Sequence, residues 1–142
     1  MTVVLDASAL LAYLKNEPGG DRVDRVLAES VMSSVNWAKV IQKSILILRG
    51  YANAAGVDVE GMLDDLQALG LIIEPFMSED GEMAGRLWKQ TRQYGLSLGV
   101  GVASPLETRA CLSLGLRLGV AVLTSDRAWA SLNLSLDIQV IR

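Results

Sequence analysis

The sequence predicts a single α/β domain over residues 1–142, with a parallel sheet flanked by helices. Short runs of β-branched and apolar residues alternate with longer segments whose apolar residues recur every three or four positions. Strands that alternate with helices pair in parallel through right-handed crossovers. A length of 142 residues with 51% hydrophobic side chains suits one domain with a sizeable core.

The first half of the chain supplies two strands and three helices. Residues 2–5, Thr-Val-Val-Leu, form an apolar β-branched run that predicts a buried strand, and a helix follows over residues 7–14. Residues 21–29 have apolar positions at helical spacing, and residues 31–34 predict a second short strand. Over residues 35–48 the apolar side chains recur at intervals of three and four, which is one face of a helix.

The second half continues the alternation. The predicted helices cover residues 59–69, 78–94 and 109–118, and the predicted strands cover residues 71–74, 120–124 and 138–141, the last at a sheet edge. Pro75 ends one strand, because proline cannot continue the ladder. Ser78 and Asp80 are candidate caps of the helix that follows, and Gly119 is the stop signal of the last helix.

The composition excludes several kinds of site. The chain has no histidine, so histidine bases, histidine nucleophile systems and histidine metal sites are absent. Cys111 is the single cysteine, which excludes an internal disulfide and predicts a small buried apolar side chain. The net charge of −3 disfavours broad, non-specific nucleic-acid binding unless a local basic rim or a basic partner supplies attraction. Catalysis must therefore use carboxylates, hydroxyls, amines or a hard metal ion.

The N-terminal segment predicts neither export nor membrane insertion. It has no basic region before its apolar stretch and carries Asp6 within it. No other run approaches the roughly 18 apolar residues of a spanning helix. We therefore expect a cytoplasmic protein without a membrane partner.

Two aspartates follow predicted strands at the same end of the sheet. Asp6 comes directly after the strand at 2–5, and Asp126 follows the strand at 120–124 after Ser125. In open parallel sheets, ligand sites lie outside the carboxyl ends of the strands. With the hydroxyls of Ser8 and Thr124 nearby, the pair suits one hydrated Mg²⁺ or Mn²⁺ bound through oxygen. Alternatively, both aspartates simply cap the helices that follow them.

Four stretches, in the same order along the chain, resemble segments of VapC-type PIN-domain toxins: VVLDASALLAYLKNEPG, SSVNWAKVIQK, RACLSLGLRLG and VAVLTSDRAW. The resemblance spans nearly the whole chain. It implies a Rossmann-like parallel sheet and a Mg²⁺- or Mn²⁺-dependent endoribonuclease of a type II toxin-antitoxin system. It also implies an RNA substrate, a homodimer and inhibition by a VapB-type antitoxin.

The resemblance also assigns residues. The first and last family aspartates correspond to Asp6 and Asp126, with Ser8 and Thr124 as the hydroxyls of the same motifs. The pattern that reads NWAKV here usually contains a glutamate where this chain has Lys39. This charge reversal should weaken cation binding, because Lys39 repels the cation and could itself pair with Asp6.

A second departure lies just before RACL, where the family usually has an aspartate and this chain has Thr108. Glu107 is the nearest acid and is the third candidate metal ligand. One residue along a helix is a rotation of about 100°, so we expect Glu107 to reach the site only if the helix start is irregular. The stretch LGVGVASPLET, residues 98–108, looks like a replacement or an insertion.

Three functions remain open at this point. The first is an RNA-cleaving toxin whose cation is held by Asp6, Asp126 and Glu107, with activity attenuated by Lys39. The second is a PIN fold that dimerises and binds antitoxin or RNA without cleaving. The third, a small-molecule phosphate-handling enzyme, would share the two aspartates but not the four-segment resemblance.

Other features have simpler interpretations. Trp37, Trp88 and Trp129 lie in apolar helical surroundings, which favours core or interface positions over base stacking. Arg86, Lys89 and Arg92, three residues apart, could line an RNA path, although a solvated helix face is the favoured interpretation. The stretch GLSLGVG lacks the spacing of a dinucleotide-binding loop.

Overall fold

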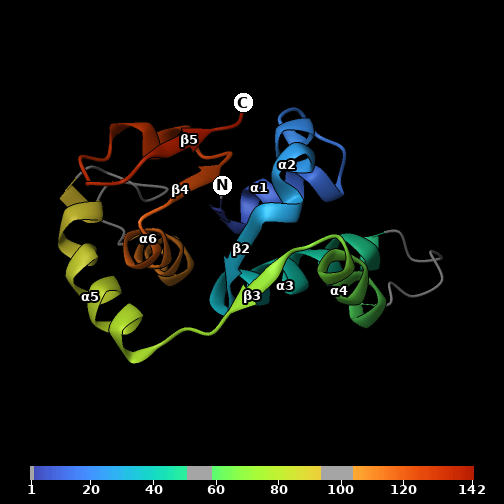
Figure 1. The fold of residues 1–142 in the computed structure, drawn as a ribbon, viewed down its shortest axis with the longest axis horizontal. Coiled ribbons are helices and arrows are strands. Elements are labelled where there is room, and N and C mark those ends of the chain that lie inside the picture. The colour runs from blue at the N-terminus through green and yellow to red at the C-terminus, as the bar shows by residue number, and fades with distance from the viewer. Residues whose placement is uncertain (1, 51–58, 94–103) are drawn as a thin grey trace.

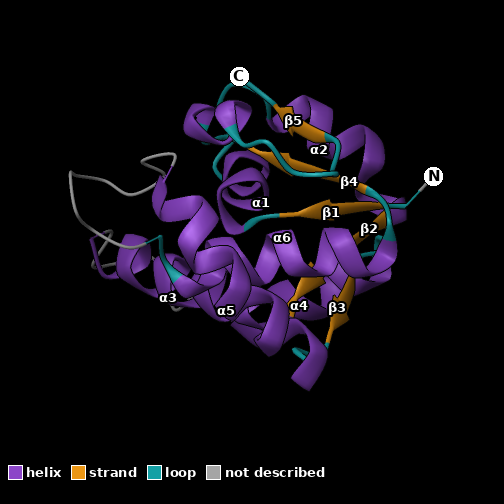
Figure 2. Cartoon of the chain, turned by 90° about the vertical axis from the view of Figure 1, so that its left-hand side faces the viewer, coloured by secondary structure: helices purple, strands orange, loops and turns teal. Residues whose placement is uncertain are grey.

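The computed structural model describes residues 2–50, 59–93 and 104–142. Their strands form one parallel sheet in the order β3-β2-β1-β4-β5. The strands are β1 (Val3–Leu5), β2 (Ser30–Ser33), β3 (Ile72–Glu74), β4 (Ala121–Thr124) and β5 (Ile138–Val140). Figure 2 shows β1 near the middle of the sheet, with β3 and β5 at its two edges. The predicted parallel α/β fold is confirmed.

Helices cover both faces of the sheet (Figure 1). They are α1 (Ala7–Leu14), α2 (Gly20–Val26), α3 (Ser34–Gly50), α4 (Val59–Ala68), α5 (Ser78–Gln93) and α6 (Leu106–Leu118), with short 3₁₀ helices η1 (Leu27–Glu29) and η2 (Arg127–Ser131). Helices α1 to α4 lie over one face, and α5 and α6 lie over the other.

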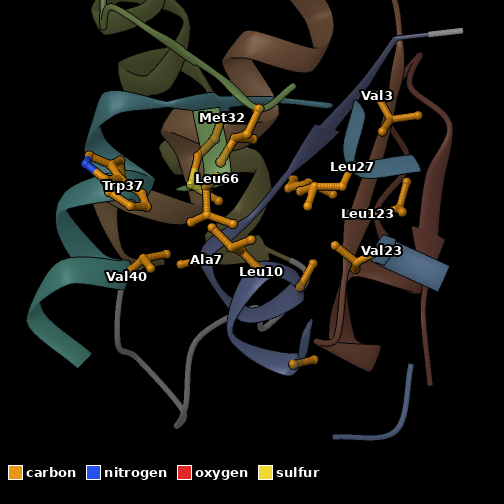
Figure 3. Close-up of a cluster of buried hydrophobic side chains, with 14 of the residues drawn as sticks. Val3, Ala7, Leu10, Val23, Leu27, Met32, Trp37, Val40, Leu66 and Leu123 are labelled. Atoms are coloured by element: carbon orange, nitrogen blue, oxygen red, sulfur yellow. The ribbon is translucent and has the colours of Figure 1, made fainter. Parts of the chain in front are cut away.

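The two hydrophobic cores follow from the alternation of side chains along each strand. Val3 and Leu5 of β1 join the cluster formed with α1 to α4, part of which Figure 3 shows. Val4, between them, joins the opposite cluster, where Leu87 of α5 and Leu112 of α6 pack. Each fully buried side chain of this size contributes roughly 1.5–3 kcal/mol of hydrophobic stabilisation. The sheet is therefore fixed from both sides, and its strand ends are held in place.

Two predicted helices have different bounds from those expected. The segment at 21–29 is divided into α2 and the 3₁₀ turn η1. Helix α6 begins at Leu106, not at residue 109, because Pro105 in an extended conformation stands at its N-cap, where a missing N–H costs no helical hydrogen bond. Tyr94, the expected end of α5, and the stretch GLSLGVG lie outside the described residues.

The predicted cap and core residues can be compared directly. Asp80 is confirmed as a cap, since its carboxylate accepts a hydrogen bond from the Met77 N–H at 2.9 Å. Trp37, Trp129 and Cys111 are buried as expected. Trp88 is 38% exposed on α5, so a core position is wrong for it, whereas the alternative expectation of an interface position stays a prediction. No helix in the described part of the chain has both the length and the apolar character needed to span a membrane.

Gly115 brings α6 close to the sheet and supports a stability prediction. A Cβ at this position would lie 2.5 Å from Val122 Cγ2 and 3.1 Å from Leu136 Cδ1. We expect Gly115→Ala to destabilise the fold by about 1–3 kcal/mol in urea unfolding, because overpacking outweighs the gain in helix propensity. Gly85→Ala in α5, where the space is open, is the matched control and should stabilise by up to about 1 kcal/mol. Equal effects of the two substitutions would contradict this packing argument.

Candidate functional site at the carboxyl end of the sheet

The ends of β1 and β4 bring the two predicted aspartates together. The strands are neighbours, with Leu5 opposite Leu123, and the Asp6 N–H donates to the Leu123 carbonyl at 3.0 Å. Asp6 therefore lies beside Thr124, the last residue of β4, and Asp126 follows two residues later. As expected, these residues lie together at the carboxyl end of the sheet.

The carboxylate of Asp6 receives hydrogen bonds from three donors. The Ser8 hydroxyl donates to both carboxylate oxygens at 2.7 and 2.9 Å, and the Thr124 hydroxyl donates to Oδ2 at 2.6 Å. The Ala9 N–H donates to Oδ1 at 2.8 Å, which makes Asp6 the N-cap of α1. The hydrogen bond that caps α1 therefore also fixes the Asp6 carboxylate in the site, at the carboxyl end of the sheet.

Burial dominates the electrostatics of Asp6. The side chain is only 5% exposed, and desolvation raises its pKa from 3.8 to about 6. The hydrogen bonds from Thr124, Ala9 and Ser8 oppose this rise in the pKa, and the negative charge of Asp126 adds to it. The protein therefore keeps a carboxylate in a place where the charged form is costly.

Asp126 and the hydroxyls of Ser8 and Thr124 complete the group of polar residues at the carboxyl end of the sheet. Asp126 is exposed and caps η2, with its Oδ1 accepting from the Ala128 N–H at 3.0 Å. Its own N–H donates to the Thr124 hydroxyl at 3.0 Å, and the Ser8 hydroxyl accepts from the Ser125 N–H at 3.0 Å. Ser8 and Thr124 therefore connect the loop after β4 to Asp6.

A pocket of about 380 Å³ opens in front of these residues. Asp6, Ser8 and Asp126 line it at the strand ends, whereas Thr124 lies buried behind Asp6. Helix α3 contributes Asn36, Lys39 and Lys43 to the lining, and the start of α6 contributes Pro105, Glu107 and Thr108. Leu11 and Trp129 are among the apolar lining residues.

The structure corrects two expectations about the charged residues. Glu107 reaches the pocket from the first turn of α6, so no irregular helix start is needed. The expectation was wrong because it placed the start of the helix three residues too late. Lys39 Nζ lies 3.5 Å from Glu107 Oε1, so its ion pair is with Glu107 and not with Asp6.

Asn36 is a site residue that the sequence reasoning missed. It is 1% exposed; its Oδ1 accepts from the Ala7 N–H at 3.2 Å, and its Nδ2 donates to the Glu107 carbonyl at 3.0 Å. It therefore ties the starts of α1 and α6 to α3. The signal available was the helical spacing of Asn36 and Lys39, which places the amide on the same face of the helix as the lysine at the usual glutamate position.

The donor set can be tested against a divalent cation. Asp6, Asp126 and Glu107 border one pocket and offer only oxygen, which suits Mg²⁺ or Mn²⁺. Lys39 already supplies a positive charge there and holds Glu107. Within the described residues, no three acidic or cysteine side chains stand close enough to form a ready metal-binding group. Asp6 and Asp126 are therefore suitable oxygen donors for a cation, and Glu107 would join them only by leaving Lys39.

The chain has a PIN-like parallel α/β fold, which it shares with solved toxin-antitoxin structures. A solved toxin-antitoxin complex from Klebsiella pneumoniae is similar, with a TM-score of 0.67 and 12% identity over 99% of this chain and 98% of that one. DNA-bound VapBC from Salmonella typhimurium has a TM-score of 0.62 and 14% identity over 100% and 99% of the two chains. VapBC2 from Rickettsia felis, bound to a promoter DNA fragment, has a TM-score of 0.60 and 15% identity over 98% of each chain.

The likeness is one of fold, and it agrees with the resemblance of the sequence to VapC-type PIN domains. No family model matches the chain. No curated protein matches it in sequence either. The activity and the roles of the individual residues therefore rest on the site itself.

Proposed function

We propose that this chain is the toxin of a type II toxin-antitoxin pair, a cytoplasmic endoribonuclease that forms a homodimer and is inhibited by a VapB-type antitoxin. The observation that carries the proposal is the convergence of Asp6, Asp126 and Glu107 on one pocket at the carboxyl end of the sheet. The full-length similarity in fold to toxin-antitoxin structures supports the choice of partner.

Asp6, Asp126 and Glu107 would hold one Mg²⁺ or Mn²⁺ ion. When bound, such an ion supplies activation of water and neutralises charge on the phosphate under attack. The chain's own contribution is positioning. Thr124 and Ser8 orient the Asp6 carboxylate by hydrogen bonds, and Asn36 fixes the start of α6, which carries Glu107.

A second function, binding of antitoxin or RNA without cleavage, is favoured by one specific observation. The Lys39–Glu107 ion pair occupies the pocket that the cation would use. Both side chains are about one-third exposed, at 34% and 30%, and an ion pair of this exposure contributes at most about 1 kcal/mol. The pair therefore weakens cation binding without forbidding it, which is why we place cleavage first.

Calorimetric titration with Mn²⁺ separates the two functions. We expect the Lys39→Glu variant to bind Mn²⁺ at least about tenfold more tightly than the unaltered protein, because it exchanges an ammonium group for a fourth carboxylate. Lys89→Glu on α5, outside the pocket lining, makes the same change in net charge and is the matched control.

Each outcome of the titration assigns a function. Weak but measurable Mn²⁺ binding by the unaltered protein supports the attenuated nuclease. Binding by Lys39→Glu alone supports the non-cleaving module. Equal affinities for Lys39→Glu and Lys89→Glu would contradict the assignment of the cation to this pocket.

A further inference from the structure

The pocket has a cationic wall that the proposed cation does not explain. Asn36, Lys39 and Lys43 follow one another at helical spacing on α3, and all three line the pocket. Asp6 and Asp126 line the same pocket from the ends of β1 and β4. The pocket lining therefore combines two aspartates from the strand ends with two lysines from α3.

Lys39 and Lys43 differ in whether their ammonium groups form an ion pair. Lys39 pairs with Glu107 at 3.5 Å, whereas Lys43 is exposed and has no ion-pair partner among the described residues. A carboxylate that is about one-third exposed, as that of Glu107 is, is a weak partner for Lys39. A phosphodiester group carries a negative charge shared by two oxygens and can accept from both ammonium groups at once.

The net charge of the chain, −3, makes a local basic surface necessary for any nucleic-acid ligand. Of the three α5 residues singled out by the sequence, Arg86 and Lys89 are exposed and lie outside the pocket lining, and the side chain of Arg92 lies outside the described part of the chain. Lys39 and Lys43 are the cations among the residues that line the pocket.

We propose that Lys39 and Lys43 form a phosphate-binding wall, in which a backbone phosphate of single-stranded RNA takes the place of Glu107 as the partner of Lys39. The ligand class rests on the proposed function; the wall itself rests on the placement of the two lysines. The exchange leaves the Glu107 carboxylate unpaired beside Asp6 and Asp126. In this arrangement Lys39 binds the substrate. The lysine at the usual glutamate position thus contributes to RNA binding.

Fluorescence anisotropy with a labelled single-stranded RNA, in EDTA so that no cation-dependent cleavage occurs, tests the wall. Lys39→Met/Lys43→Met should weaken RNA binding by about tenfold or more at low salt and reduce the salt slope by about 0.7, the value for one lost phosphate contact on a single strand. Arg86→Met/Lys89→Met, with the same loss of charge on α5, should stay within about twofold of the unaltered protein. Glu107→Gln should bind RNA more tightly, because it releases Lys39.

A DNA strand of the same sequence should behave as the RNA does, because ammonium groups contact phosphate and not the 2′-hydroxyl. If the α5 double variant loses affinity and the α3 double variant does not, the inference fails while the proposed function stands. An unchanged or lowered affinity in Glu107→Gln would also overturn the exchange of partners. If the unaltered protein binds neither strand, RNA is not its substrate, and both the proposed function and the phosphate-binding wall are wrong.

Discussion

Asp6→Asn is expected to stabilise the folded protein at neutral pH by about 2 kcal/mol while removing a site residue. The pKa of Asp6 is about 6 in the folded protein against an ordinary value of 3.8. That difference corresponds to about 3 kcal/mol of unfavourable free energy when the group is ionised. Asparagine keeps the acceptor for the Ala9 N–H, and we allow about 1 kcal/mol for the exchanged hydrogen bonds with Ser8 and Thr124.

The sign of the pH dependence follows from the raised pKa. Between pH 3.8 and about 6 the folded protein binds the Asp6 proton more tightly than the unfolded chain does. The contribution of Asp6 to stability therefore falls as the pH rises through this window, and the full penalty applies above it. Asparagine does not titrate, so the advantage of Asp6→Asn should be largest near neutral pH and vanish in acid.

Urea unfolding at neutral pH and below pH 4 measures both effects. Asp137→Asn is the control, because Asp137 precedes β5 at the amino end of the parallel strands, whereas Asp6 follows β1 at their carboxyl end. A loss of stability at neutral pH in Asp6→Asn, or a gain that does not depend on pH, would show that the Asp6 carboxylate is not strained by burial.

Asp126→Asn is expected to lower cation-dependent RNA cleavage by about 100-fold or more, with little change in stability. Asp126 is exposed and its Oδ1 caps η2, a role that asparagine retains. The substitution thus removes a charge from the pocket and leaves the local fold in place. Initial rates on a mixed RNA pool with Mn²⁺, beside the Asp137→Asn control, provide the measurement. Equal rates for the two variants would remove Asp126 from the site.

The sequence predicts those features of the fold and the site that depend on local patterns. The apolar runs before Asp6 and Asp126 indicate buried strands, and the carboxyl ends of parallel strands share one edge of a sheet. Asp6, Ser8, Thr124 and Asp126 could therefore be placed together before the fold was known.

The remaining parts depend on how distant helices pack. The partner of Lys39 is set by the contact between α3 and α6, so the sequence could suggest Asp6 but could not identify Glu107. The start of α6 follows from Pro105, which lies just after a stretch without periodicity. Asn36 has a role only because it bridges two helix starts that are far apart in the chain. Outward-facing Trp88 shows that apolar neighbours in sequence do not establish burial.

A carboxylate-bound cation as the basis of activity is tested by incubating a mixed RNA pool with the unaltered protein, once with Mn²⁺ and once with EDTA. We expect slow cleavage that requires the cation and stops in EDTA. Cleavage that continues in EDTA, or none with Mn²⁺ at any protein concentration, would contradict a carboxylate-bound cation in this pocket as the basis of the activity.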